Sequence, residues 1–173
     1  DIASFFQDCV NKKNKRYVTI DETTLVKSHR CPRCICDFAS LIMPQYPEMK
    51  SVKENSQQEH CLLIKNCDVG NYVDRFNPVA LIWNNKALKN IHPNIKQRYN
   101  MGEVKGLDFP NVIVYPTENM LTWINNTTKQ LADETRAKLY VAVTRAEITI
   151  GIIVPDDFCL PSESMLQFWS NPD

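Results

Sequence analysis

Hydrophobic residues recur at helical spacing in four segments of the chain and form short uninterrupted runs in five others. Between Leu139 and Ala146 the apolar positions are spaced i, i+3, i+4 and i+7, which places them on one face of a helix. The same criterion predicts helices over residues 2–11, 31–42, 69–76 and 133–146. The apolar, mostly β-branched runs predict strands at 17–20, 61–65, 79–83, 112–115 and 148–154.

This alternation of strands and helices is typical of an α/β fold, in which a mostly parallel central sheet lies between helical layers. The runs at 112–115 and 148–154 are almost continuously apolar, as expected for strands that are covered on both faces. Functional loops are expected at the carboxyl ends of such strands. The polar stretches 50–59 and 118–130 are interpreted as surface loops.

Arg145 interrupts the apolar pattern just before the last strand. It lies off the buried stripe, on a second helical face with Lys138 and Val141, so its guanidinium is expected to leave the core near the helix carboxyl end. One interpretation is that this cation complements the helix dipole and binds the last free carbonyl groups. The other is that it binds a ligand, and the remaining motifs must decide between them.

Composition favours a single globular domain over residues 1–173, because 43% of the residues are hydrophobic and 23% are charged. The chain has 20 Lys and Arg against 20 Asp and Glu, so any nucleic-acid contact must be local rather than a bulk electrostatic effect. No apolar run is long enough to cross a bilayer, and the first residues do not resemble a signal peptide. We therefore expect a cytoplasmic protein with no membrane contact. The missing initiator Met suggests a piece of a longer chain.

The seven cysteines are odd in number, which argues against a disulfide framework and predicts reduced thiols. The stretch "CPRCIC" at 31–36 contains C-x-x-C, and His60, Cys61 and Cys67 could complete a zinc site. However, the cysteines at 31 and 34 share a helical stripe with other apolar residues, and a buried cysteine behaves as a small hydrophobe. Core packing without a metal is the prediction, and zinc is the alternative.

The glycine pattern excludes a phosphate-binding loop, so the chain cannot by itself hold a nucleoside triphosphate. The chain has four glycines and no G-x-x-x-x-G-K-[ST], and "GEVKGLD" at 102–108 fails the pattern because Leu107 follows the second glycine. An α/β domain with exposed arginines but no phosphate loop suits the second half of a two-part nucleotide site, where it supplies charge to phosphates held elsewhere.

Three segments together resemble a known family. The stretches "EVKGLDFPNVIVYPT" (103–117) and "ADETRAKLYVAVTRAEITIGIIV" (132–154) resemble motifs V and VI of the UvrD/Rep-like superfamily 1 DNA helicases. Upstream, "LVKSHRCPRCICDFASLIMP" (25–44) resembles their motif IV, and the order of the three motifs is the same. The resemblance implies the C-terminal, second RecA-like motor domain, a three-layer domain of the P-loop NTPase superfamily without its own phosphate loop.

In such a domain, Arg145 of motif VI and Arg30 of motif IV are expected to be the catalytic arginine fingers. They would reach the γ-phosphate of ATP across the cleft between two domains, while the missing N-terminal domain holds most of ATP and Mg²⁺. A planar, permanently charged guanidinium stabilises the negative charge that phosphoryl oxygens carry in the transition state.

The resemblance also implies four further nucleotide-binding residues. Asp108 stands where the family usually has Glu, and Gly106 precedes it in a turn that allows close backbone approach. Arg136 and Tyr140 lie one helical turn apart in motif VI and would connect the nucleotide to neighbouring loops.

Contact with DNA is expected from residues just before motif V. Asn100 and Gly102 occupy the positions where family members often have Thr and His, and Lys105 follows them. The family's accessory domain is absent, because only residues 44–102 separate motifs IV and V.

The function expected from this resemblance is the C-terminal motor half of an ATP-dependent DNA helicase or translocase. Its partners would be single-stranded or partly duplex DNA and the N-terminal RecA-like domain of the same protein, and it would be a monomer. One alternative is a non-catalytic regulatory or nucleic-acid-binding module that keeps a helicase-like fold. The other is a small zinc-stabilised nucleic-acid-binding domain.

Overall fold

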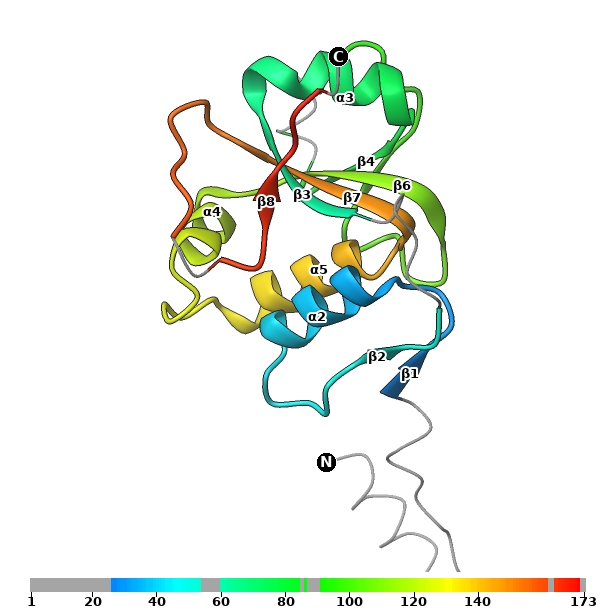
Figure 1. Ribbon diagram of the computed structural model, residues 1–173, viewed down its shortest axis with the longest axis vertical. Helices are drawn as coiled ribbons and strands as arrows, with labels where there is room; N and C mark the ends of the chain where they lie inside the picture. The colour runs from blue at the N-terminus through cyan, green and yellow to red at the C-terminus, as the bar shows by residue number, and fades with distance from the viewer. Residues whose placement is uncertain (1–25, 54–59, 85, 87–90, 162–163, 172–173) are drawn as a thin grey trace, which may run out of the picture.

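The computed structural model describes residues 26–53, 60–84, 86, 91–161 and 164–171, which form a six-stranded sheet covered by helices on both faces (Figure 1). All neighbouring strands are parallel, in the order β5-β4-β6-β7-β3-β8. The strands are β3 (His60–Lys65), β4 (Val79–Ile82), β5 (Arg98–Asn100), β6 (Phe109–Tyr115), β7 (Ala146–Val154) and β8 (Gln167–Phe168). A separate parallel pair consists of β1 (Lys27–Ser28) and β2 (Lys50–Ser51).

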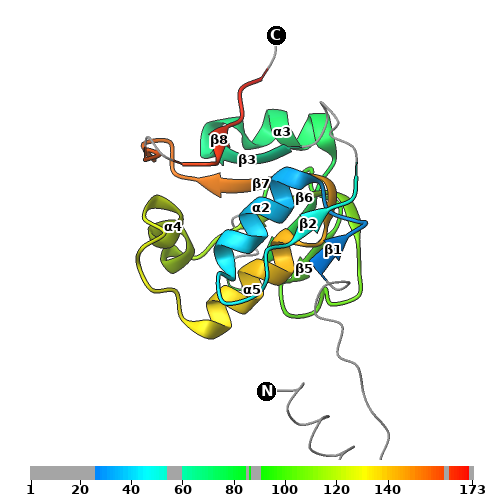
Figure 2. The ribbon, with the colours of Figure 1, turned by 60° about the horizontal axis from the view of Figure 1, so that its bottom comes forward.

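The helices form the outer two layers. Figure 1 shows α3 on one face of the sheet and α2, α4 and α5 on the other, and the turned view in Figure 2 shows α2 beside α5. Their bounds are α2 (Arg33–Ile42), α3 (Val69–Phe76), α4 (Glu118–Asn125) and α5 (Asp133–Val143), with a short 3₁₀ turn η2 (Asn66–Asp68) before α3. The predicted α/β fold with three layers and a parallel sheet is therefore confirmed.

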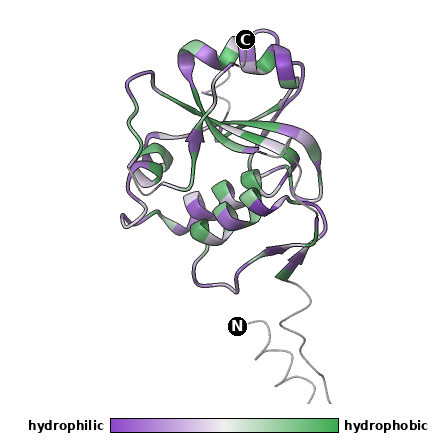
Figure 3. Cartoon of the chain, viewed as in Figure 1, coloured by the Kyte–Doolittle hydropathy of each residue, from purple (hydrophilic) through white to green (hydrophobic). Residues whose placement is uncertain are grey.

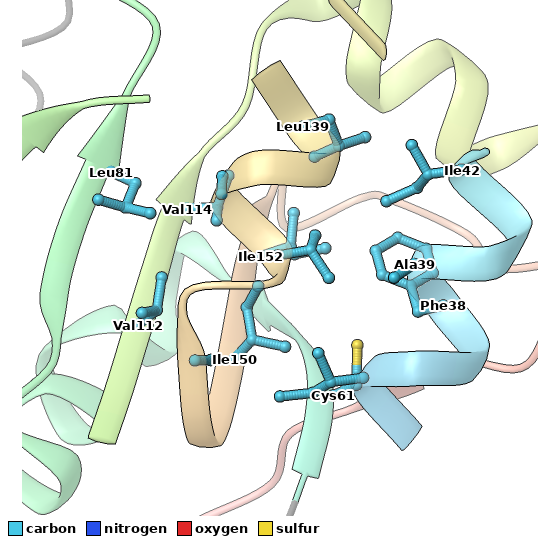
Figure 4. Close-up of a cluster of buried hydrophobic side chains, with 14 of the residues drawn as sticks. Phe38, Ala39, Ile42, Cys61, Leu81, Val112, Val114, Leu139, Ile150 and Ile152 are labelled. Carbon is cyan, nitrogen blue, oxygen red and sulfur yellow. The ribbon is translucent and has the colours of Figure 1, made fainter. Parts of the chain in front are cut away.

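The core fills both spaces between the sheet and its helices. Alternate residues of β7 face opposite sides, so Ile152 packs toward α2 and α5 whereas Ile153 packs toward α3. Figure 4 shows the larger cluster, in which residues of α2 and α5 meet those of four strands. In Figure 3 the hydrophobic colour runs along these central strands. Burial on both faces explains why the strand sequences read as continuous apolar runs.

Gly151 allows α3 to pack closely against the middle of the sheet. A Cβ atom at this position would lie 2.9 Å from Cγ1 of Ile64 and 2.9 Å from Cζ of Tyr72. The hydroxyl of Tyr72 is 3.2 Å from Oγ1 of Thr149, which donates to Oδ1 of Asn111 at 2.9 Å. This partly buried chain of hydrogen bonds holds the aromatic ring over the glycine.

The predicted elements at 31–42, 61–65, 69–76, 79–83, 112–115 and 148–154 are confirmed, with ends that differ by up to three residues. The predictions at 2–11 and 17–20 lie outside the described residues. The helix over 133–146 ends earlier than predicted, at Val143, because Ala146 already pairs with Phe109 as the first residue of β7. In the polar stretch 50–59, residues 50 and 51 form β2.

The interpretation of 118–130 as a loop is wrong for its first part, which forms α4. Oγ1 of Thr117 accepts a hydrogen bond from the N–H of Met120 at 3.4 Å and so caps the helix start. Met120, Trp123 and Ile124 are buried, and they have the i, i+3, i+4 spacing of an apolar helical face. The Asn and Thr residues that follow obscured this pattern in the sequence.

Candidate functional site

Strands β6 and β7 begin side by side at the amino edge of the sheet. Phe109 starts β6 opposite Ala146, and its N–H donates to the carbonyl oxygen of Arg145 at 2.9 Å. This pairing brings Asp108 next to Arg145, because each residue directly precedes its strand. Functional loops were expected at the carboxyl ends of the strands, whereas these two residues lie at the opposite edge, where the chain enters β6 and β7.

Arg145 is the most enclosed charged group of the site, with a side chain that is 14% exposed. Its Nη1 donates to the carbonyl oxygen of Leu107 at 3.1 Å, and its Nε donates to that of Val141 at 3.3 Å. The bond to Val141 is the helix-end contact proposed for a purely structural role, and the guanidinium extends beyond it. Burial lowers the pKa of Arg145, and the nearby charge of Arg30 lowers it further.

Arg30 reaches the same place from the turn before α2. The N–H of Cys31 donates to Oγ of Ser28 at 2.9 Å, which fixes this turn. Nη1 of Arg30 donates to the carbonyl oxygen of Thr144 at 3.0 Å, a contact between residues 114 positions apart in the sequence. The tertiary fold thus joins the predicted motif IV arginine to the end of the predicted motif VI helix.

Both arginines face one carboxylate. Oδ1 of Asp108 lies 2.8 Å from Nε of Arg30 and 3.8 Å from Nη1 of Arg145. Thr144 also connects them, because its hydroxyl oxygen accepts from Nη2 of Arg145 at 3.3 Å while its carbonyl binds Arg30. Two cations and one anion leave this cluster with a positive charge.

A cavity of about 340 Å³, which we call the arginine cavity, opens beside the guanidinium groups of Arg30 and Arg145. Its lining combines basic, hydroxyl and aromatic side chains, and consists of Lys27, Ser28, His29, Arg30, Cys31, Met49, Tyr140, Thr144 and Arg145. None of these lining residues is acidic, so the cavity suits an anion that binds guanidinium groups, such as a phosphate.

A second cavity, of about 670 Å³, has a different character. It lies beside α2 and α4, and Phe38, Leu41 and Ile124 contribute to its lining. Among its described lining residues, Lys129 is the one charged side chain. The cavity beside Arg30 and Arg145 therefore offers an anion two guanidinium groups, whereas this one offers a single ammonium group.

The predicted DNA-binding residues and Gly106, a predicted nucleotide-binding residue, lie in and beside the loop that leads to Asp108. Gly102, Lys105 and Gly106 are exposed, and Gly106 has a φ of +85°, which suits glycine. Asn100 ends β5 and is half-buried. The structure thus places these four residues outside the lining of the arginine cavity, although they share a chain segment with Asp108.

The surroundings of Gly102 are basic and aromatic. A Cβ atom on Gly102 would lie 3.8 Å from Cε of Lys138. The ammonium group of Lys138 lies 3.9 Å from the ring centroid of Trp83 and 2.8 Å from Oε1 of Glu134. The contact between Lys138 and Trp83 was not visible in the sequence, because the position of α5 relative to the end of β4 depends on the tertiary fold.

Tyr140 and Arg136 differ in their position relative to the arginine cavity. Tyr140 lines the arginine cavity, and burial raises the pKa of its hydroxyl. Arg136 lies outside this lining, where its Nη2 donates to the carbonyl oxygen of Leu131 at 3.2 Å. The expected nucleotide contact of Arg136 stays a prediction without geometric support from the cavity.

The zinc alternative finds no arrangement of ligands among the described residues. No group of three or more His, Cys, Asp or Glu residues is placed to hold a metal ion within the described ranges. Cys31, Cys36 and Cys61 are instead buried in the core, and burial raises the pKa of each thiol.

No described helix is long and apolar enough to cross a membrane.

Comparison with known proteins gives similarities only among solved structures. No protein-family model and no curated protein matches the sequence. The C-terminal domain of a possible DNA helicase from Lactobacillus plantarum has a TM-score of 0.47 and 18% identity, over 74% of this chain and 88% of that chain.

Two viral helicases are similar as well. Arterivirus nonstructural protein 10 has a TM-score of 0.46 and 22% identity, over 76% of this chain and 25% of that chain. PRRSV nsp10 has a TM-score of 0.46 and 18% identity, over 79% of this chain and 26% of that chain. The chain therefore spans about a quarter of the length of these two helicases.

Proposed function

We propose that this chain is the C-terminal, RecA-like motor half of an ATP-dependent DNA helicase or translocase of the UvrD/Rep-like type. The observation that carries the proposal is the convergence of Arg30 and Arg145 on one carboxylate beside one cavity. The resemblance singles out these two arginines as phosphate-binding residues of separate motifs. Two arginines that bind the same phosphate must lie close together, as Arg30 and Arg145 do.

The cluster has hydrogen-bond donors for phosphate oxygens, and it lacks free ligands for a metal ion. Arg30 and Arg145 would hold phosphoryl oxygens of ATP, whereas the Asp108 carboxylate is already engaged by guanidinium groups. ATP would supply the γ-phosphoryl group that is transferred to water. The two arginines would compensate the charge that develops in that step, and the other half of the protein would hold Mg²⁺ and most of the nucleotide.

The DNA role is proposed for the loop that precedes β6. Asn100, Gly102 and Lys105 would contact single-stranded or partly duplex DNA, and the same loop ends at Asp108 in the arginine cluster. A DNA contact at one end of this loop and a nucleotide contact at the other would couple hydrolysis to movement along the strand.

The test uses a protein in which this chain is joined to a phosphate-loop domain. Arg145→Ala should lower kcat of DNA-stimulated ATP hydrolysis about a thousandfold or more, since loss of an arginine finger removes transition-state charge compensation. KM should change much less. Arg145→Lys should stay strongly impaired, because an ammonium cannot replace the planar fork.

Arg33→Ala is the matched control. Arg33 lies three positions beyond Arg30, but its side chain is 73% exposed and pairs with Asp37 outside the cavity lining. Its replacement should leave turnover unchanged. If Arg145 only binds the helix carbonyl of Val141, Lys would be tolerated, and Ala would cost about 0.3–1 kcal/mol of stability without loss of turnover. That outcome, or robust ATP hydrolysis by the isolated 173-residue chain, would refute the half-site.

A further inference from the structure

Asp108 places an anion where two arginines meet. Its Oδ1 is 2.8 Å from Nε of Arg30 and 3.8 Å from Nη1 of Arg145. A carboxylate oxygen and a phosphate oxygen accept the same charge-assisted hydrogen bonds from guanidinium groups. The carboxylate therefore has the chemistry of the ligand proposed for this cavity.

We propose that Asp108 is an internal counter-ion that holds Arg30 and Arg145 in the absence of nucleotide and gives up Arg30 when a phosphate binds. This inference rests on the proposed function and deepens it. Asp108 is then a positioning residue, because it acts through the two arginines. It differs from the nucleotide contact that the family resemblance implies for this position, since it competes with phosphate.

Electrostatics explain why the cluster needs an anion. Burial and the neighbouring charge of Arg30 lower the pKa of Arg145, whereas the charge of Asp108 raises it. The two guanidinium groups thus repel each other, and the carboxylate offsets this repulsion. A phosphate that enters the cavity offsets it as well and brings more negative charge, so the exchange of one anion for another is favourable.

The remaining contacts allow the exchange without loss of the arginine positions. Arg145 keeps its bonds to the carbonyl oxygens of Leu107 and Val141, and Arg30 keeps its bond to the carbonyl of Thr144. These bonds do not involve Asp108. The Asp108 side chain is 37% exposed, so its carboxylate can turn to water instead of becoming buried without a partner.

The test measures inorganic pyrophosphate binding to the 173-residue chain by isothermal titration calorimetry. Asp108→Asn keeps the size of the side chain and removes the competing charge, so it should tighten pyrophosphate binding about two- to fivefold, the usual range for one partly exposed ion pair. Asp108→Glu keeps the charge and should bind close to the wild-type affinity. A merely structural role of Asp108 predicts weaker binding in both variants.

Asp108→Ser is the second neutral variant and should also tighten binding. Unfolding temperatures establish that each variant is folded, so a folded Ser variant keeps the test valid if Asn destabilises the chain. Equal or weaker pyrophosphate binding in the neutral variants would overturn the inference, as would undetectable binding in all of them. Weaker ATP binding with unchanged pyrophosphate binding would overturn it too, because Asp108 would then contact the nucleoside.

Arginine variants separate this inference from the proposed function. Arg30→Ala and Arg145→Ala should each weaken pyrophosphate binding, and Arg30→Ala should abolish the gain of Asp108→Asn. If the arginine variants bind pyrophosphate as tightly as the wild type, the proposed phosphate site itself fails. If binding depends on the arginines but Asp108→Asn weakens it, only the counter-ion inference fails.

Discussion

Replacing Gly151 with alanine should destabilise the folded chain by about 2 kcal/mol, because the new methyl group has no space between the sheet and α3. Its Cβ would meet Cγ1 of Ile64 and Cζ of Tyr72 at 2.9 Å, and Cε1 of Tyr72 at 3.1 Å. Real Cβ atoms essentially never approach other atoms within 3.0 Å, so the ring or the strand must move.

The Tyr72 ring has little freedom to move. It is fully buried, its centroid lies 4.6 Å from that of Phe76 and 5.6 Å from that of Trp169, and its hydroxyl contacts Thr149. Overpacking of this kind costs about 1–3 kcal/mol, and the upper half applies when the neighbours are fixed. The lower entropy of the unfolded alanine chain offsets about 0.4–1 kcal/mol. A net loss of about 2 kcal/mol remains.

Equilibrium urea unfolding of the 173-residue chain, followed by circular dichroism, measures this difference. Gly102→Ala is the control, because its Cβ would make only an ordinary contact, at 3.8 Å from Lys138. This control should stay within about 0.5 kcal/mol of the wild type. A Gly151→Ala chain of wild-type stability would refute the account of how α3 packs on the sheet.

Two further stability predictions concern α4 and the buried thiols. Thr117→Ala removes the hydroxyl that accepts a hydrogen bond from the N–H of Met120, so it should lower the free energy of unfolding in urea by about 1 kcal/mol. Thr117→Ser keeps the hydroxyl and should cost much less. Equal losses in the two variants would contradict the capping role. Burial raises the pKa of Cys36 from 9.0 to about 12, so the unfolded chain loses this proton first as pH rises. Stability should therefore fall between about pH 9 and 12, and the fall should be smaller in Cys36→Ala; an unchanged slope would contradict the burial of this thiol.

The sequence alone determined the four central strands of the sheet, because strands buried on both faces must be apolar almost throughout. The run at 148–154 shows this for β7, and the helix at 69–76 was predicted with its exact bounds. Short edge strands escaped prediction. β5 has three residues and β8 has two, so neither is long enough to display a period.

The chemistry of the candidate site was also visible in the sequence, in the form of two arginines within motifs. Their mutual position was not. Arg30 and Arg145 meet at Asp108 because β6 and β7 pair from Phe109 and Ala146 onward, and because the end of α5 receives Arg30 at Thr144. Strand register and helix packing depend on contacts between residues far apart in the chain, which no local pattern encodes. Only the tertiary structure therefore decided that the arginines share one carboxylate at the amino edge of the sheet.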